Sequence, residues 1–298
     1  MISESGAPMH DQPPIRQRLL WRRLLAAWIV VVFLLRQIGS SQETDDKRLA
    51  DRWFAAYRKI AESIEMHRGD AILKLEDKPL LFYTNPIRMN DQHGTIFLWT
   101  ERGRPAVFGS IWSERNRMNP AVRNVTHEFH SLAQTADAEA ARSGNVLWSA
   151  EEAGIEWQTI ENCPAPATSR PARLAQMRDM GRRLSASVRA GDGDSDLRLM
   201  TQPLFRYPEQ VEEAIDGGLF TFALATDPEI VVWMEAIEHS GREQWRFAFA
   251  RFGHFPMRVK DGERTIWSCA YVQPPLKRGK YCCVWRAEQM PADPTNKQ

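Results

Sequence analysis

The sequence lacks the short motifs that mark the common enzyme classes. Its 298 residues hold four cysteines and no Cys-x-x-Cys pair, which excludes a zinc ribbon and a thioredoxin-like motif. It has no phosphate-binding glycine loop, no Gly-x-Ser-x-Gly elbow and no pair of carboxylates at an indicative spacing. These absences leave no ground for naming an activity, and we expect neither a cofactor nor a metal site.

Neither positive nor negative charge is in excess. Thirty-nine basic residues stand against 38 acidic ones, a formal net charge of +1. A nucleic-acid-binding protein usually carries a basic excess, so we expect no nucleic-acid partner. Hydrophobic residues make up 43% of the chain and charged residues 26%, which is ordinary globular usage. The length fits one large or two modest domains.

Long hydrophobic runs are also scarce, and the clearest lies near the amino terminus. Twelve apolar residues run from Leu24 to Leu35, followed by Arg36 and preceded by Arg16, Arg18, Arg22 and Arg23. This length is typical of a signal-peptide core, whereas a membrane-spanning helix needs about 20 residues. A membrane helix that runs to Ile38, with Arg36 snorkelling, stays the alternative. We therefore expect membrane attachment through residues 19–38, or secretion after signal cleavage.

A shift of 124 positions lays residues 194–238 on residues 70–114 without a gap. The pairs that coincide are Pro79 with Pro203, Leu80 with Leu204, Tyr83 with Tyr207, and Gly94 with Gly218. Glycine and proline fix backbone geometry, so their coincidence with the apolar pattern favours one fold used twice over a chance alignment. Helical periodicity precedes each copy, from Thr44 and from Ser169.

These patterns predict an α+β fold with two tandem helix-plus-antiparallel-sheet units, related by internal duplication and preceded by the signal or anchor helix. In the second unit, Ser169 caps a helix whose apolar face includes Leu184 and Val188 and which ends at Gly191. The expected segments are a basic N-terminus with the signal or anchor (1–43), a first unit (44–142), a linker (143–168), a second unit with a C-terminal hairpin (169–288), and a disordered tail (289–298).

One cluster invites a catalytic interpretation. His127-Glu128-Phe129-His130 has the wrong spacing for the zinc signature His-Glu-x-x-His. In a strand, His127 and His130 point to opposite faces, so ordinary strand histidines are the simpler interpretation. We keep His127, Glu128 and His130 as weak catalytic candidates.

Tyr83, Tyr207 and Arg206 are weak candidates for binding. Because the tyrosine occurs in both copies, we expect a buried ring at a helix-sheet interface whose hydroxyl has a partner. Arg206 has Phe82 as its counterpart, so an arginine role would belong to one unit alone.

The cysteines allow a disulfide. Cys269 and either Cys282 or Cys283 lie symmetrically about the loop of the predicted terminal hairpin, so a cross-strand disulfide is geometrically reasonable in an exported protein. Buried free thiols are the alternative.

Four short motifs carry a resemblance, and they are His127-Glu128-Phe129-His130-Ser131-Leu132, Pro203-Leu204-Phe205-Arg206-Tyr207, Asp216-Gly217-Gly218-Leu219-Phe220 and Thr226-Asp227-Pro228-Glu229. Together they resemble uncharacterised exported or membrane-anchored proteins that planctomycete bacteria encode in several copies. The resemblance implies a cell-envelope location and a bacterial origin. It brings no activity and no catalytic residue.

Two functional hypotheses follow. The first is a non-enzymatic cell-envelope protein that offers a binding or interaction surface to a small molecule or a protein partner. The alternative is an envelope hydrolase-like enzyme that uses His127, Glu128 or His130 beside Tyr83 or Tyr207. A pocket in which these side chains converge would favour the enzyme.

Overall fold

The computed structural model describes residues 48–85, 91–160, 163–191, 193–209 and 211–294. Residues 52–298 form one compact unit. One helix, described over residues 48–62, enters this unit, and a second helix, α2 (Arg170–Arg183), lies within it. The strands of its first part are β1 (Glu65–Arg68), β2 (Ala71–Ile72), β3 (Lys74–Leu75), β4 (Leu81–Asn85), β5 (Gln92–Glu101), β6 (Arg104–Arg115), β7 (Val122–Ser131), β8 (Ala138–Arg142), β9 (Asn145–Ser149) and β10 (Gln158–Thr159).

The remaining strands are β11 (Leu184–Ala190), β12 (Gly193–Arg206), β13 (Asp216–Leu224), β14 (Asp227–His239), β15 (Arg242–Arg251), β16 (Met257–Asp261), β17 (Arg264–Cys269) and β18 (Tyr281–Pro291). They form an eight-stranded sheet, β10-β15-β14-β13-β12-β11-β16-β17, and a six-stranded sheet, β18-β7-β6-β5-β3 with β4 also on β5. A four-stranded sheet has the order β2-β1-β8-β9.

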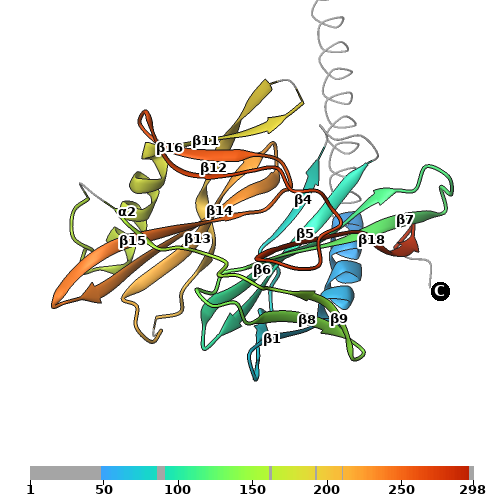
Figure 1. The fold of residues 1–298 in the computed structure, drawn as a ribbon, viewed down its shortest axis with the longest axis horizontal. Coiled ribbons are helices and arrows are strands. Elements are labelled where there is room, and N and C mark those ends of the chain that lie inside the picture. Colours follow the sequence, from blue (N-terminus) through green and yellow to red (C-terminus); the bar gives the residue numbers. More distant parts are fainter. Residues whose placement is uncertain (1–47, 86–90, 161–162, 192, 210, 295–298) are drawn as a thin grey trace, which may run out of the picture. The chain divides into compact units, whose positions relative to one another are not determined.

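The central strands of the two large sheets are buried on both faces. In β5, Phe97 and Trp99 join the core beneath the helix of residues 48–62, while Ile96 and Leu98 face the eight-stranded sheet. Side chains alternate along a strand, so a strand covered on both sides needs apolar residues at nearly every position. Figure 1 shows α2 against the eight-stranded sheet, where Met177 is fully buried. The inner faces of the two sheets pack on each other.

Helix α2 begins as predicted and ends earlier. Ser169 is its N-cap, and the Ser169 hydroxyl accepts a hydrogen bond from the Ala172 N–H at 3.3 Å. Leu184 already has extended backbone angles, and β11 pairs with β12 and β16. Leu184 and Val188, which were expected on the helix, therefore belong to a strand. In the sequence Leu-Ser-Ala-Ser-Val, apolar and polar residues alternate with the period of two that is typical of a strand. This segment forms a strand although Leu184 and Val188 also have helical spacing.

The predicted α+β class is wrong. Strands hold 57% of the described residues and helices 12%. The two parts are also not equivalent units, because β8 and β9 join β1 in a separate sheet, whereas β16 and β17 extend the eight-stranded sheet. Even the ungapped shift fails locally: Tyr83 lies over Gly94, but Tyr207 lies over Gly217 and not over Gly218. Apolar spacing does not specify which sheet edge a strand joins.

The predicted C-terminal hairpin is also wrong. Strand β17 pairs with β16, and β18 pairs with β7 at the edge of the six-stranded sheet. Gln289 to Pro291, which were assigned to a disordered tail, are the last residues of β18. An edge strand exposes unpaired N–H and C=O groups, and β18 satisfies those of β7.

The expectation of a transmembrane helix needs correction as well. In the part of the chain that the structure describes, no helix is long and apolar enough to cross a membrane. Membrane attachment through residues 19–38 is therefore not supported, and the apolar run from Leu24 to Leu35 lies outside the described residues.

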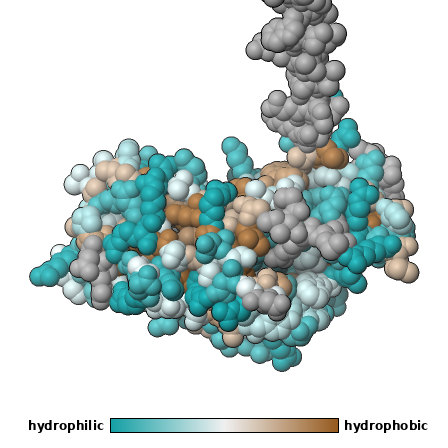
Figure 2. Space-filling view, turned by 90° about the horizontal axis from the view of Figure 1, so that it is seen from above, coloured by the Kyte–Doolittle hydropathy of each residue, from teal (hydrophilic) through white to brown (hydrophobic). Residues whose placement is uncertain are grey.

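Figure 2 shows hydrophilic residues over much of the face in view, with apolar residues gathered toward its middle. The large apolar side chains that stay exposed among the described residues are Leu49, Ile72, Met118, Val146, Tyr271 and Trp285. Two of these, Tyr271 and Trp285, contact the same histidine ring.

A buried carboxylate connects the two large sheets. Glu235 of β14 is 0% exposed and accepts a hydrogen bond from Arg104 of β6 at 2.6 Å and from Arg246 of β15 at 2.8 Å. The Tyr207 hydroxyl donates to the same carboxylate at 2.6 Å and accepts from the Trp233 indole at 2.8 Å. Tyr207 is therefore buried with a hydroxyl partner, but between the sheets instead of beneath a helix.

Tyr207→Phe should lower the free energy of unfolding by about 2 kcal/mol, because it removes a hydrogen bond to a charged group and leaves the buried Trp233 N–H without an acceptor. Urea unfolding would measure the change. Tyr271→Phe is the matched control, since its hydroxyl bonds an exposed Gln273 and its loss should change little. Equal stabilities for the two variants would contradict the role of Tyr207.

Candidate functional site

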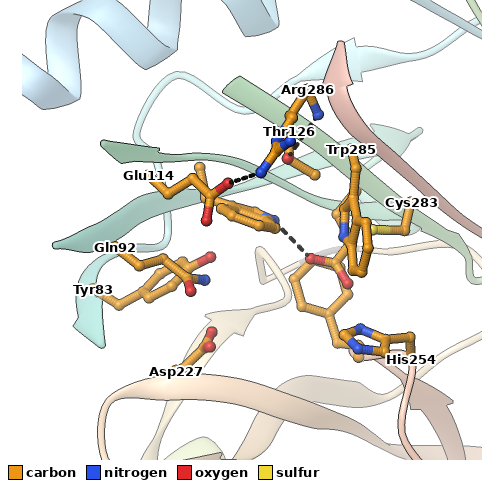
Figure 3. Close-up of a pocket in the computed structure, with 13 residues that line it drawn as sticks. Tyr83, Gln92, Glu114, Thr126, Asp227, His254, Cys283, Trp285 and Arg286 are labelled. Carbon is orange, nitrogen blue, oxygen red and sulfur yellow. Dashed lines mark hydrogen bonds and ion pairs between the residues drawn. The ribbon is translucent and has the colours of Figure 1, made fainter. Parts of the chain in front are cut away.

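A cavity of about 340 Å³ opens where the six-stranded sheet meets the first residues of β14. Figure 3 shows Glu114 and Arg286 on one side of it, and Asp227 and His254 on the other. Its lining consists of Tyr83, Gln92, Trp112, Glu114, Thr126, Glu128, Asp227, Phe252, Gly253, His254, Cys283, Trp285 and Arg286. Aromatic rings and ionisable side chains thus share one concave space, as in many ligand sites.

A cross-strand row forms one wall of the cavity. Tyr83, Gly94, Trp112 and Thr126 lie opposite one another across β4, β5, β6 and β7. A Cβ atom on Gly94 would lie 2.4 Å from the Trp112 Cβ and 2.8 Å from the Tyr83 hydroxyl. Glycine is therefore required for the two aromatic side chains to approach each other over β5.

A bulge in β18 brings two further side chains to the cavity. Val284 lies opposite His127 and Glu288 opposite Val125, so three residues of β18 face the single residue Thr126. The freed N–H of Arg286 donates to the Thr126 hydroxyl at 3.3 Å. Bulges of this kind redirect side chains, and this bulge directs Trp285 and Arg286 to the cavity (Figure 3).

Arg286 has a strained backbone. Its φ is 53°, in the left-handed region that favours glycine. The other described non-glycine residues with positive φ lie in the connections between strands, whereas Arg286 lies within β18. Such strain persists where the surrounding structure enforces it and is concentrated at functional sites.

Glu128 is a buried carboxylate of the lining. It is 8% exposed, and it accepts hydrogen bonds from the Trp112 indole at 3.1 Å and from the Tyr281 hydroxyl. Burial and the nearby Glu128 charge raise the pKa of Tyr281 well above its ordinary value, so Tyr281 stays a neutral donor. At the rim, Arg286 and Glu114 form an ion pair of 3.3 Å.

The eight-stranded sheet contributes Asp227 and a short loop. Asp227 is the first residue of β14 and accepts a hydrogen bond from Asn85 of β4 at 2.7 Å. The loop that carries His254 is held by Arg251, whose guanidinium donates to the Gly253 carbonyl at 2.9 Å and to the Phe255 carbonyl at 3.2 Å. Both sheets therefore fix side chains of the cavity.

Aromatic side chains continue from the cavity to the surface. The His254 ring lies 5.5 Å from that of Trp285 and 6.1 Å from that of Tyr271, in edge-to-face geometry in both cases. Trp285 is 43% exposed. Aromatic side chains therefore line the mouth of the cavity.

The catalytic candidates do not converge. His127 donates through Nε2 to Glu288 at 2.8 Å, on the face of β7 opposite to Glu128. His130 is fully buried, donates through Nδ1 to the Ser131 carbonyl at 2.7 Å, and does not line the cavity. Burial lowers the pKa of His130 to about 3. Of the three candidates, only Glu128 reaches the cavity.

The binding candidates are divided in the same way. Tyr83 lines the cavity, and its hydroxyl lies 3.0 Å from that of Ser110. Arg206 instead binds Asp216, which also accepts from Arg173 at 2.9 Å. Burial alone would raise the pKa of Asp216, but these two arginines lower it below its usual value. Arg206 also donates to the Arg170 carbonyl of α2 at 2.6 Å, so it links α2 to β13.

The four cysteines are free thiols. Cys269 lies in β17, whereas Cys282 and Cys283 lie in β18, so the hairpin that would have brought them together does not exist. Cys283 lines the cavity, and burial followed by the Glu128 charge raises the pKa of its thiol. The thiol stays protonated and is a poor nucleophile.

Sequence reasoning missed most of the cavity. The pair Asp227-Pro228 is typical of a turn, but the turn lies at residues 225–226 and Asp227 is the first residue of β14. Trp285 and Arg286 reach the cavity only because of the bulge, and no pattern in the sequence predicts that bulge. Gly94 was the available signal, because an isolated glycine in a strand marks a close approach.

No protein-family model, no curated protein and no solved structure matches this chain. Within the described residues, no three histidine, cysteine or acidic side chains are grouped so that they could hold a metal ion. The geometry of the cavity is therefore what a functional proposal rests on.

His93 and His130 should make stability depend on pH. Burial lowers the pKa of both to about 3, and in His93 the charge of Arg123 adds to the effect. An unfolded histidine binds its proton near pH 6.5, so between pH 6.5 and about 3 the unfolded chain holds more protons. The stability that the two neutral histidines contribute is fully present above pH 6.5. As the pH falls below 6.5, the free energy of unfolding decreases by roughly 1.4 kcal/mol per pH unit for each histidine.

Urea unfolding across this pH window would measure the slope, and proton NMR would follow the two rings directly. Their resonances should not shift between neutral pH and about 4.5, whereas the same histidines in urea-unfolded protein should titrate near pH 6.5. A folded-state titration of His130 near neutral pH would instead return it to the catalytic candidates.

Proposed function

We propose that this protein is a non-enzymatic small-molecule-binding protein whose ligand enters the cavity between Asp227 and Arg286. The observation that carries the proposal is the bulge of β18, which places Trp285 and the strained Arg286 at the cavity mouth. A regular strand would pair with β7 without that strain, so a role beyond stability is expected.

The composition of the lining supports ligand binding. Ligand sites are concave, largely apolar, and hold a few fixed polar groups. Here Trp112 and Phe252 supply apolar walls, while Glu128 and Asp227 are held by donors from neighbouring strands. The polar groups are thus oriented before any ligand arrives.

A second hollow, of about 370 Å³, is less suited to this role. Its arginines already pair with carboxylates: Arg68 with Glu101 at 2.7 Å and Arg102 with Glu212 at 3.1 Å. Arg104 completes the buried network of Glu235. These ion pairs hold the arginines there without a ligand.

The hydrolase alternative has no comparable support. A general base must lie within hydrogen-bonding reach of the proton that it removes. His127 and His130 are engaged elsewhere, and neither lines the cavity. The cell-envelope location stays a prediction from the sequence.

A fragment screen tests the proposal. Ligand-observed NMR of a small neutral and charged fragment library against the full chain should find binders that Trp285→Ala weakens by about tenfold, a typical cost for losing a large aromatic contact. Met118→Ala, on an exposed loop side chain, is the control. A library with no binder sensitive to Trp285 would contradict the proposal.

Arg286→Gly separates stability from binding. Glycine adopts φ near 53° without penalty, so the free energy of unfolding should rise by about 1 kcal/mol. The lost ion pair with Glu114 costs little, because the Arg286 side chain is 70% exposed. Fragment binding should nevertheless weaken.

Ser240→Gly is the matched control, since Ser240 has the same φ of 53° but lies in the turn between β14 and β15. It should gain similar stability and leave fragment binding unchanged. A destabilised Arg286→Gly, or one that binds fragments as tightly as the parent, would show that the strain has no part in the site.

A further inference from the structure

We propose that the cavity binds the pyranose ring of a sugar. This inference rests on the function proposed above and adds the chemical class of the ligand. A pyranose ring has two faces of apolar C–H groups and a rim of hydroxyl groups. The cavity wall has the complementary arrangement, because the cross-strand row with its two aromatic side chains has polar side chains on both of its sides.

The polar side chains lie two residues away from the cross-strand row. Gln92 precedes Gly94 by two residues in β5, and Glu114 follows Trp112 by two residues in β6. These strands are antiparallel, so both side chains lie on the same side of the row. Glu128, two residues beyond the row in β7, lies on the other side. Residues two apart in a strand share a face at a spacing of roughly 7 Å, so a ring on the row has polar groups at both edges.

Gln92 is a polar group that a ligand would satisfy. It is 7% exposed, lines the cavity, and points to the cavity interior (Figure 3). Within the described residues, the Gln92 amide has no hydrogen-bond partner. A buried amide without a partner costs free energy. An amide both donates and accepts, and so does a sugar hydroxyl, so the two groups suit each other.

Thr126 offers a second polar contact in the row itself. Its side chain is buried, and its hydroxyl accepts from the Arg286 N–H at 3.3 Å. The hydroxyl keeps a proton that it can donate to an acceptor in the cavity. The bulge of β18 therefore leaves this hydroxyl as a donor to a ligand.

Trp285 supplies an aromatic surface at the cavity mouth. It is 43% exposed, and the edge-to-face contact with the His254 ring at 5.5 Å holds its orientation. The cavity volume of about 340 Å³ is near the lower end for ligand sites, which is roughly 300 Å³, so one ring fills it. A substituent or a second ring of the ligand would then pack on Trp285.

Two other ligand classes fit this lining less well. A flat aromatic compound would pack on Trp112 and Trp285, but its rim has few hydrogen-bonding groups and would leave the Gln92 amide without a partner. An alkylated ammonium ion has no acceptor for that amide or for the Thr126 hydroxyl. Both classes are therefore included as probes.

Ligand-observed NMR with the full chain tests the inference. The sugar probes are the methyl glycosides of glucose, galactose, mannose and N-acetylglucosamine. Tetrahydropyran-2-methanol is the matched probe, since it keeps the ring and one hydroxyl and lacks the others. Benzyl alcohol represents flat aromatic compounds, and choline represents organic cations.

We expect at least one methyl glycoside to bind roughly tenfold more tightly than tetrahydropyran-2-methanol, because a site that hydrogen-bonds hydroxyl groups rejects an analogue that lacks them. The absence of binding by all four glycosides would overturn the inference. So would an affinity for the glycosides no greater than that for any other probe. In either case a fragment that still depends on Trp285 leaves the proposed function intact.

A disaccharide of the sugar that binds best distinguishes two sources of the same ring. Tighter binding than that of the methyl glycoside would support a polysaccharide chain, because a second ring adds contacts at Trp285. Equal or weaker binding would support a free sugar.

Gln92→Leu removes the amide and keeps the approximate size of the side chain. It should weaken glycoside binding about tenfold and change the affinity for tetrahydropyran-2-methanol little. Gln244→Leu is the matched control, because Gln244 is a half-buried strand residue outside the cavity lining. Thermal melts check that each variant folds. A folded Gln92→Leu variant that binds the glycoside as tightly as the parent does would overturn the inference.

Discussion

The mutual burial of the inner faces of the two large sheets is the constraint on which the rest of the structure depends. Each sheet has a helix on its outer face, so its inner face is covered by the other sheet. Large and small side chains meet there: Phe108 packs edge-to-face on Phe252 at 4.7 Å, and Ala248 and Ala250 leave room beside them. Without this contact, both sheets would expose a continuous apolar face to water.

Charged and polar side chains lie at the two ends of this inner core. At one end of β14, Glu235 is buried and must be satisfied by arginines and by Tyr207, since an unpaired buried carboxylate costs several kcal/mol. At the other end, Asp227 lies beside the cavity and takes its hydrogen bond from Asn85 of the opposite sheet. The same strand therefore carries a closed ionic network at one end and an open site at the other.

The local features of this fold could be predicted from the sequence. The Ser169 cap follows from its residue type, and the alternation in β15 correctly assigns Phe247 and Phe249 to one face and Ala248 to the other. Strand partners could not be predicted, because β17 and β18 have the spacing of a hairpin and nevertheless join different sheets. The site depends on those partners, so its residues could not be assembled from spacing alone.

The bulge of β18 has two effects: it interrupts the pairing with β7, and it brings side chains to the cavity. If β18 were a regular edge strand, it would form hydrogen bonds with most of the backbone N–H and C=O groups of β7 that face it. Instead it gives up ladder pairing over three residues and recovers part of it through Thr126, whose hydroxyl accepts from the Arg286 N–H. That exchange places an exposed indole and a strained arginine beside buried carboxylates. Trp285 stays 43% exposed, so the bulge adds little to core packing, and its geometry agrees with the binding role proposed for the cavity.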